Sequence, residues 1–317
     1  GNTVVLKPST ESAVSGGLIL AQIFEQAGLP KGVLNVVTNG PGKSSEIGDV
    51  FVKDKRVRRI TFTGSTEVGR ILAEKAGNYL KKVTLELGCS SPLIVLKDAD
   101  IEYAVNAAVF GWYLHQGQVC MSTKRIIVEK EIAEKFTEEF IRKVKTLKAG
   151  DPRSNDIIVG PLINENQRNK LLLEIERAIE QGAKLIYGGD YKGLVFYPTV
   201  LTGVTEDMDI FYEETFGPVA SIIVADNAEE ALRLANNCDY GLSAGIITAN
   251  VNKGIELAEK LEFGCTHING ATVHDESHVP FGGMKDSGWG RNGIEAIEEY
   301  TEIRWVTLQK DKISFKF

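Results

Sequence analysis

One cysteine stands in a polar turn of small residues between two apolar segments. The stretch GWYLHQGQVCMSTKR begins at Gly111, and Cys120 follows Gln-Gly-Gln-Val and precedes Met-Ser-Thr. A cysteine that only fills space normally lies inside an apolar run. A thiol in a polar turn instead suits a nucleophile, since the thiolate form attacks electrophilic carbon. The sequence therefore predicts that Cys120 is presented for chemistry.

A carboxylate is the second candidate, in the stretch TLELGCSSP. Glu86 follows the apolar residues Val83 and Leu85 at the end of a predicted strand. Burial next to such residues raises the pKa of a carboxylate and makes it a usable base near neutral pH. The alternative is a solvated side chain on a sheet edge, which would have no catalytic role.

Glycine-containing turns offer places for a phosphate-bearing ligand. In ITFTGSTEVGR a predicted strand runs into Gly64, with Ser65 next and Gly69 at the start of a helix. Glycine lets backbone amides approach a ligand closely, and a helix N-terminus attracts a diphosphate. Most strand-glycine-helix turns bind nothing, so this motif alone is weak. The stretches EETFGPV from Glu213 and VPFGGMKDSGWGR from Val279 could equally be a loop and a surface connector.

Composition limits the classes of protein that fit. The chain has 317 residues, 43% hydrophobic and 25% charged, with a formal net charge of −7 and no basic stripe, which argues against a nucleic-acid partner. No apolar stretch approaches the length of a membrane span. The four cysteines are widely spaced, which fits a reducing cytoplasm better than a disulfide framework. His274 and His278 are four residues apart, but Pro280 argues against a helix there, so no metal site is predicted.

Strand and helix patterns alternate along most of the chain. Strands are predicted at residues 3–8, 33–37, 57–64, 82–88, 92–98, 125–129, 184–189, 219–225, 242–248 and 264–269, and helices at 12–27, 43–52, 65–77, 101–115, 132–147, 167–181, 228–237 and 252–261. This rhythm indicates an α/β fold with a parallel, doubly wound sheet, in two lobes. The last residues, YTEIRWVTLQKDKISFKF, alternate like an edge strand that pairs with another chain.

Taken together, the motifs have a specific order. The chain contains K-P-S, F-T-G-S-x-x-V-G, L-E-L-G, G-Q-x-C, E-x-F-G-P and P-F-G-G-x-K-x-S-G, with Glu86 and Cys120 separated by 34 positions. This series resembles the aldehyde dehydrogenase superfamily from Gly1 to about Gln309. The resemblance implies an incomplete Rossmann-like cofactor domain at 1–88, an α/β catalytic domain at 89–270, a return segment at 271–303, and an oligomerisation strand and tail at 304–317. It also implies a homodimer or homotetramer for the full-length protein.

The resemblance assigns roles to the candidate residues. Cys120 would attack a small aldehyde to give a thiohemiacetal, hydride would pass to the nicotinamide, and water activated by Glu86 would hydrolyse the remaining thioester to the acid. His115 and Phe281 would line the substrate pocket. The resemblance also suggests, weakly, benzaldehyde-like or short hydroxyaldehyde substrates.

The resemblance likewise places the cofactor. Lys7 would contact the adenosine ribose, Glu214 and Phe216 the nicotinamide end, and Gly64, Ser65 and Gly69 the diphosphate. Many members that use NAD carry Glu after K-P-S, where this chain has Thr10. A neutral residue there tolerates the 2′-phosphate, so NADP is favoured over NAD, with dual use left open.

Two features depart from the family pattern. The Pro-Trp-Asn-like segment that supplies an oxyanion-hole asparagine upstream of K-P-S is not in this chain, so the chain is expected to lack an N-terminal part and to be inactive alone. Cys89 and Ser90 replace the usual Gly-Lys beside Glu86. Two alternatives therefore stay open. One is a CoA-acylating enzyme, against which Glu86 argues; the other is an inactive fragment or structural relative.

Overall fold

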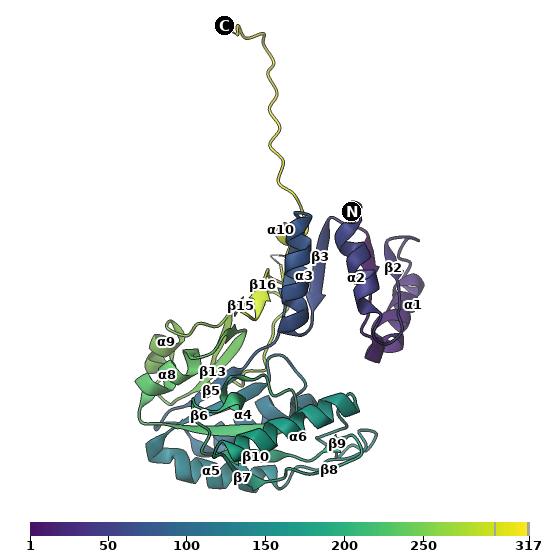
Figure 1. The fold of residues 1–317 in the computed structure, drawn as a ribbon. Coiled ribbons are helices and arrows are strands. Elements are labelled where there is room, and N and C mark those ends of the chain that lie inside the picture. The colour runs from purple at the N-terminus through teal and green to yellow at the C-terminus, as the bar shows by residue number, and fades with distance from the viewer. Residues whose placement is uncertain (295, 316–317) are drawn as a thin grey trace.

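A seven-stranded sheet forms the larger part of the molecule. The computed structural model describes residues 1–294 and 296–315 (Figure 1). The strand order is β14-β13-β5-β6-β11-β10-β7, and every neighbouring pair is parallel except β7 with β10. Its strands are β14 (Cys265–Ile268), β13 (Ser243–Ile247), β5 (Ser91–Val95), β6 (Thr123–Glu129), β11 (Val219–Ala225), β10 (Thr199–Thr202) and β7 (Lys184–Tyr187). The predicted α/β class is confirmed.

Helices cover both faces of this sheet, which explains why its central strands are almost wholly buried. On one face Leu93 and Val95 of β5 pack with α4 (Ile101–Tyr113) and α5 (Lys130–Val144). On the other face Ile94 packs in a core with α6 (Glu165–Glu180), α8 (Ala228–Asn236) and α9 (Val251–Ala258). Successive side chains of a strand point to opposite faces, so a continuous apolar run serves two cores.

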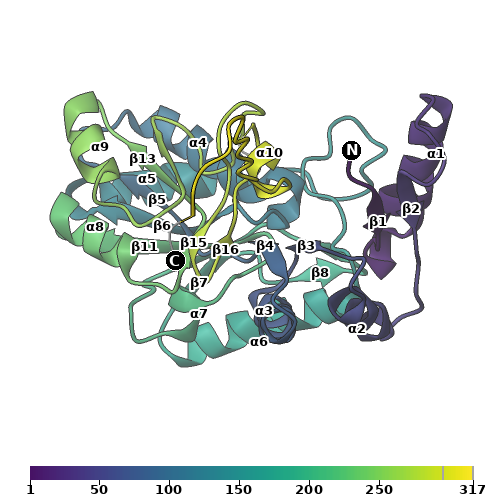
Figure 2. The same cartoon turned by 90° about the horizontal axis from the view of Figure 1, so that it is seen from above.

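The first part of the chain forms smaller sheets. β3 (Arg59–Thr63) is parallel to β4 (Lys82–Glu86), and β16 (Gly288–Trp289) returns antiparallel to β4. β1 (Val4–Leu6) and β2 (Leu34–Val36) form a separate parallel pair, which lies with α1 (Ile19–Gln26) to one side of β3 (Figures 1 and 2). α2 (Ser44–Lys53) and α3 (Thr66–Asn78) complete this part. The chain thus crosses from the small sheet to the large one between β4 and β5.

Several short elements were not predicted from the sequence. They are the strands β8 (Tyr191–Lys192), β9 (Val195–Phe196), β10, β12 (Tyr240–Gly241), β15 (Met284–Lys285) and β16, and the helices α7 (Asp209–Tyr212) and α10 (Ala296–Glu299). The predicted helix at 12–27 is divided into a 3-10 turn (Thr10–Ser12), a π-helical segment (Val14–Leu18) and α1. Gly17 lies in this segment, where a Cβ would come within 2.6 Å of the Pro8 ring.

The predicted C-terminal strand is not formed within the chain itself. Residues 301–315 run away from the body as an extended tail, and the side chain of Trp305 is 91% exposed (Figure 1). A lone strand leaves its backbone groups unpaired, so it needs a neighbouring edge. Its pairing with another chain stays a prediction, and residues 316–317 of the predicted strand lie outside the described residues. Among the described residues, no helix is both long enough and apolar enough to cross a bilayer.

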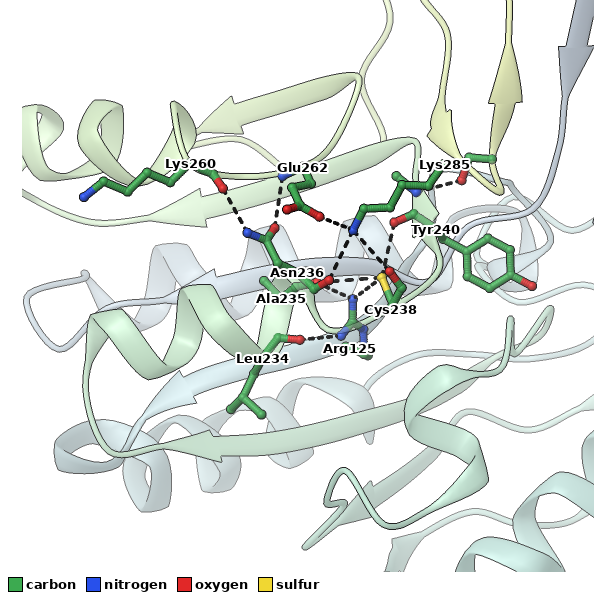
Figure 3. A network of polar contacts seen from close by, with 11 residues as sticks. Arg125, Leu234, Ala235, Asn236, Cys238, Tyr240, Lys260, Glu262 and Lys285 are labelled. Carbon is green, nitrogen blue, oxygen red and sulfur yellow. Dashed lines mark hydrogen bonds and ion pairs between the residues drawn. The ribbon is translucent and has the colours of Figure 1, made fainter.

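Arg125 on β6 joins several elements from a fully buried position (Figure 3). Its guanidinium donates to the carbonyls of Leu234 (2.7 Å) and Ala235 (2.8 Å) at the end of α8, and to the carbonyl of Ser90 (3.0 Å) just before β5. Lys285 of β15 reaches the same helix end through the carbonyl of Asn236 (3.2 Å). Cations at a helix C-terminus satisfy its free carbonyls and its dipole.

This network predicts a large loss of stability for Arg125→Met. The change should lower the free energy of unfolding by about 3 kcal/mol or more, because three buried carbonyls lose their donor. Urea denaturation followed by circular dichroism measures the loss. Arg153→Met is the control, since Arg153 is exposed and pairs only with Asp151 among the described residues; its unfolding midpoint should not move. A loss below about 1 kcal/mol for Arg125→Met would contradict the anchoring role.

Candidate active site

Cys120 lies at the end of a strained loop. The loop begins with a 3-10 turn (Leu114–Gly117) after α4 and ends at β6. His115 and Gln116 have positive φ angles of 51° and 56°, which non-glycine residues rarely adopt. Side chains hold this shape: Gln116 Nε2 donates to the carbonyl of Pro161 (3.2 Å), and Gln118 Oε1 accepts from the amide of Ile163 (3.0 Å). Strain of this kind persists only where surrounding contacts enforce it, as at functional sites.

Cys120 is half-buried and packs against the core to which α6 and α8 contribute. Burial raises the pKa of Cys120 to about 11, with further contributions from the nearby Cys89 thiol and the Glu214 and Glu86 carboxylates. The group is therefore protonated at neutral pH. A nucleophilic thiol in this state needs a base to remove its proton.

Glu86 has the properties of such a base. Its side chain ends β4, where the residue is only 7% exposed. Burial raises the pKa of Glu86 to about 7, with Asp275 adding to the rise and Arg291 opposing it. Oε1 accepts a hydrogen bond from Asn292 Nδ2 (3.0 Å), whereas Oε2 has no hydrogen-bond partner among the residues described. The carboxylate can therefore take a proton near neutral pH on an oxygen that is not already engaged.

Glu214 lies against the segment that follows Glu86. Its Oε1 accepts from the amide of Cys89 (3.0 Å). Gly88 leaves room for this carboxylate, because a Cβ there would stand 2.5 Å from Glu214 Oε2. Burial raises the pKa of Glu214, while Lys124 opposes the rise. The structure thus brings Glu86, Cys120 and Glu214 into one electrostatic neighbourhood.

The predicted diphosphate residues surround the start of α3. Ser65 caps the helix, its Oγ accepting from the amide of Val68 (3.4 Å), and Gly64 donates its amide to the carbonyl of Glu86 (3.0 Å). Gly69 is buried, and a Cβ there would stand 2.5 Å from the Leu87 side chain. Close helix–strand packing therefore explains Gly69 by itself, and a part for it in diphosphate binding stays a prediction.

The predicted ribose residues lie in the first segment of the chain. Lys7 is half-buried, and its Nζ donates to the carbonyl of Pro8 (2.8 Å) and lies 3.4 Å from Asn39 Oδ1 and from Ser44 Oγ. Thr10 starts the 3-10 turn and is partly exposed. Their contacts with a ribose stay predictions.

The two predicted pocket residues differ in their surroundings. Phe281 packs against the same core as Cys120, and its carbonyl accepts from the amide of Asn292 (2.8 Å), the residue bound to Glu86. His115 is exposed on the strained loop. Phe281 is therefore coupled to Glu86 through Asn292. Among the described residues, no hydrogen bond or ion pair ties the His115 side chain to Glu86 or Cys120. Over residues 1–294 and 296–315, no cluster of three His, Cys, Asp or Glu side chains could hold a metal ion.

Sequence reasoning missed two polar residues of the site. Asn292 follows a glycine-rich stretch and carries no motif of its own, so only the folded chain shows its bond to Glu86. The sequence did contain a feature that could have indicated Lys124, because it stands with Arg125 at the start of an otherwise apolar strand. Charged residues in such a strand are rarely buried without a partner.

Known proteins resemble this chain in sequence over its whole length. The model of the aldehyde dehydrogenase family matches residues 1–306. The chain belongs to this family. It is 47% identical to benzaldehyde dehydrogenase YfmT of Bacillus subtilis over 318 residues, covering 100% of this chain and 65% of the relative.

Solved structures of the family superpose closely on this one. A salicylaldehyde dehydrogenase from Pseudomonas putida G7, complexed with salicylaldehyde, matches with a TM-score of 0.97 and 44% identity, covering 100% of this chain and 66% of that one. The glyceraldehyde-3-phosphate dehydrogenase GapN of Methanocaldococcus jannaschii, complexed with NADP, matches with a TM-score of 0.86 and 40% identity, covering 93% and 64%. This chain thus spans about 65% of the length of these family members.

If the natural protein that contains this chain oxidises aldehydes with Glu86 as the base, the pKa values predict the pH dependence of that reaction. Glu86 must be ionised to act as a base, so kcat/KM should rise from pH 5.5 and level off above about 7. Glu86→Gln should lower kcat/KM about 10²–10³-fold and remove this bend. Steady-state NAD(P)H absorbance in the natural protein that contains this chain measures both.

A different profile would reject Glu86 as the base for the thiol. If Cys120 ionised unaided, kcat/KM would keep rising tenfold per unit toward its pKa of about 11. A bend near pH 7 that survives in Glu86→Gln would have the same consequence, since another group would then produce it.

Proposed function

We propose that the natural protein containing this chain oxidises aromatic aldehydes to carboxylic acids with NADP or NAD. The observation that carries the proposal is the pairing of a half-buried nucleophilic thiol, Cys120, with a buried carboxylate, Glu86, whose pKa is raised to about 7. The benzaldehyde and salicylaldehyde dehydrogenases that resemble the chain over its whole length support the aromatic substrate class.

The chain's own residues fit a dinucleotide. The N-terminus of α3, which follows Gly64 and is capped by Ser65, offers backbone amides to a diphosphate. Glu214, fixed by the Cys89 amide, offers a carboxylate to ribose hydroxyls beside Cys120. When bound, the nicotinamide accepts a hydride from the substrate carbon.

The proposed reaction uses Glu86 twice. Glu86 first takes the proton of Cys120, and the thiolate adds to the aldehyde carbon, giving a thiohemiacetal. Loss of hydride leaves an acyl thioester on Cys120, and Glu86 releases the first proton to solvent, which restores its carboxylate. Glu86 then takes a proton from a water molecule that attacks the thioester. The acid is released, and the departing Cys120 thiolate takes this proton back from Glu86, which restores the thiol. In sum, aldehyde, water and NAD(P)⁺ give acid, NAD(P)H and a proton.

The wider organisation is proposed in the same way. A division near residue 88 is supported by β4 and β5, which flank this position and lie in different sheets. A homodimer or homotetramer is supported by the exposed apolar side chains of the tail, among them Trp305, Val306 and Leu308. The return segment at 271–303, the oligomerisation strand and tail at 304–317 and a cytoplasmic location stay predictions.

The test is an aldehyde panel on the natural protein that contains this chain. Benzaldehyde and salicylaldehyde should give kcat/KM values at least about tenfold above propanal, since ring burial in a pocket contributes more than a short alkyl chain. Cys120→Ser should lose oxidation and keep nucleotide binding. Equal rates for propanal would reject the aromatic class, and turnover by Cys120→Ser would reject the nucleophile. NAD(P)H formation that required added CoA, with acyl-CoA as the product in place of the acid, would instead favour a CoA-acylating enzyme.

Cofactor choice is tested at Thr10, because NADP is the proposed preference. Thr10→Glu should lower the ratio of kcat/KM for NADP to that for NAD about tenfold, since a carboxylate would face the 2′-phosphate. Thr146→Glu is the matched control, because it adds the same charge at an exposed position after α5. An unchanged ratio for Thr10→Glu would show that Thr10 does not face the ribose.

A further inference from the structure

Lys124 is a buried lysine beside the nucleophile. It stands near the start of β6, a strand in which every residue is buried, and is 2% exposed itself. The register between β5 and β6 shifts at this point: Ser91 pairs with Thr123 and Pro92 with Arg125, so Lys124 has no partner on β5. Such a bulge redirects a side chain and is frequent next to active sites.

The ammonium of Lys124 contacts two loops. Nζ donates to the carbonyl of Gly117 at 2.7 Å, in the loop that carries Cys120. It also lies 5.2 Å from the ring centre of Phe216, the residue two positions after Glu214. A buried cation over an aromatic face is a favourable contact. One side chain thus touches the nucleophile loop and the loop proposed to hold the nicotinamide ribose.

The two loops also meet directly through glycines. Gly117 has a φ angle of 69°, and a Cβ there would stand 2.3 Å from the carbonyl oxygen of Gly217. A Cβ on Gly217 would stand 2.2 Å from the Leu171 side chain of α6. The backbones therefore approach as closely as glycine permits, and Lys124 lies at this junction.

The groups that face Lys124 oppose the effect of burial on its pKa. Burial lowers the pKa of Lys124 to about 8, while Glu214, the thiols Cys89 and Cys120, and Glu174 of α6 raise it. Glu174 also forms an ion pair with Lys170, whose Nζ lies 3.3 Å from Glu174 Oε1. The Lys170 side chain is half exposed. An ammonium among these groups offsets the free-energy cost of burying the carboxylates. The carboxylates in turn offset the free-energy cost of burying the ammonium.

We infer that Lys124 is a positioning residue, whose ammonium ties the Cys120 loop to the Glu214–Phe216 loop and so couples nucleotide binding to the placement of the thiol. This inference rests on the proposed function. It assigns Lys124 no contact with substrate. A purely structural lysine would affect stability alone, whereas the coupling predicts that binding and thiol reactivity change together.

The test compares Lys124→Met, Lys124→Gln and Lys170→Met in the natural protein that contains this chain. Lys124→Met removes the donor and the charge, and Lys124→Gln keeps a donor. Lys170→Met is the matched control, since it removes a cation from Glu174 without touching either loop. Two readouts are the Kd for NADP, from fluorescence titration, and the rate of Cys120 alkylation by iodoacetamide with and without NADP. Thermal unfolding confirms that each variant is folded.

Three results are expected. Lys124→Met should raise the Kd for NADP about tenfold and change the alkylation rate at least about fivefold, while removing the effect of NADP on that rate. Lys124→Gln should lie between Lys124→Met and the parent. Lys170→Met should stay within about twofold of the parent in both readouts.

The pH dependence gives a further check that needs no variant to fold. As pH rises through about 8, Lys124 loses its charge, so the affinity of the parent for NADP should fall over that range. Lys124→Gln should lack this fall. A constant parent affinity between pH 7 and 9 would overturn the coupling even if Lys124→Met and Lys124→Gln proved unstable.

Other outcomes separate this inference from the proposed function. Folded Lys124→Met with parental Kd and alkylation rate would overturn the positioning role. A parent that oxidises no aldehyde, but whose Cys120 alkylation still changes in Lys124→Met and not in Lys170→Met, would reject the proposed function and support the tie between the loops.

Discussion

The site depends on one pairing of distant segments, that of β4 with β16. Gly288 lies opposite Glu86, the amide of Leu87 donates to the carbonyl of Ser287 (3.1 Å), and Ser287 Oγ donates to the carbonyl of Gly88 (2.7 Å). These bonds hold the segment that crosses between the two sheets. Asn292 lies four residues after Gly288, so the same pairing also brings the side-chain amide of Asn292 to Glu86. Without it, the base would have neither its burial nor its partner.

Burial at this crossing gives the site its chemical character. Desolvation disfavours the charged forms of both Glu86 and Cys120, and so raises both pKa values. The pKa of Glu86, the proposed base, is the lower of the two, and that of Cys120, the proposed nucleophile, is the higher. Burying a charge at this crossing costs free energy, and two cations of β6 offset that cost. Arg125 satisfies the end of α8, and Lys124 faces the carboxylates beside the thiol.

Much of this was accessible from the sequence because it was encoded locally. Continuous apolar runs such as LIV before Leu96 predicted strands buried on both faces, and helical periodicity predicted the helices α4, α5, α6, α8 and α9 that cover them. Cys120 was recognisable because a thiol in a polar turn conflicts with simple packing. Glu86 was recognisable because a carboxylate ends an apolar strand. Residue type and immediate neighbours carry these signals.

Tertiary structure decided what depends on distant segments. The strand order, the split of the parallel strands into separate sheets and the return of β15 and β16 follow from packing between distant residues, such as Gly288 with Glu86, which no local pattern records. The sequence around Gly69 predicts a phosphate-binding turn, yet the contact with Leu87 requires a glycine there for packing alone. Asn292 and Lys124 acquire their partners only when loops meet. The sequence by itself thus determined which groups can react, and the fold determined which groups set their pKa values, because desolvation and charge act through space and not along the chain.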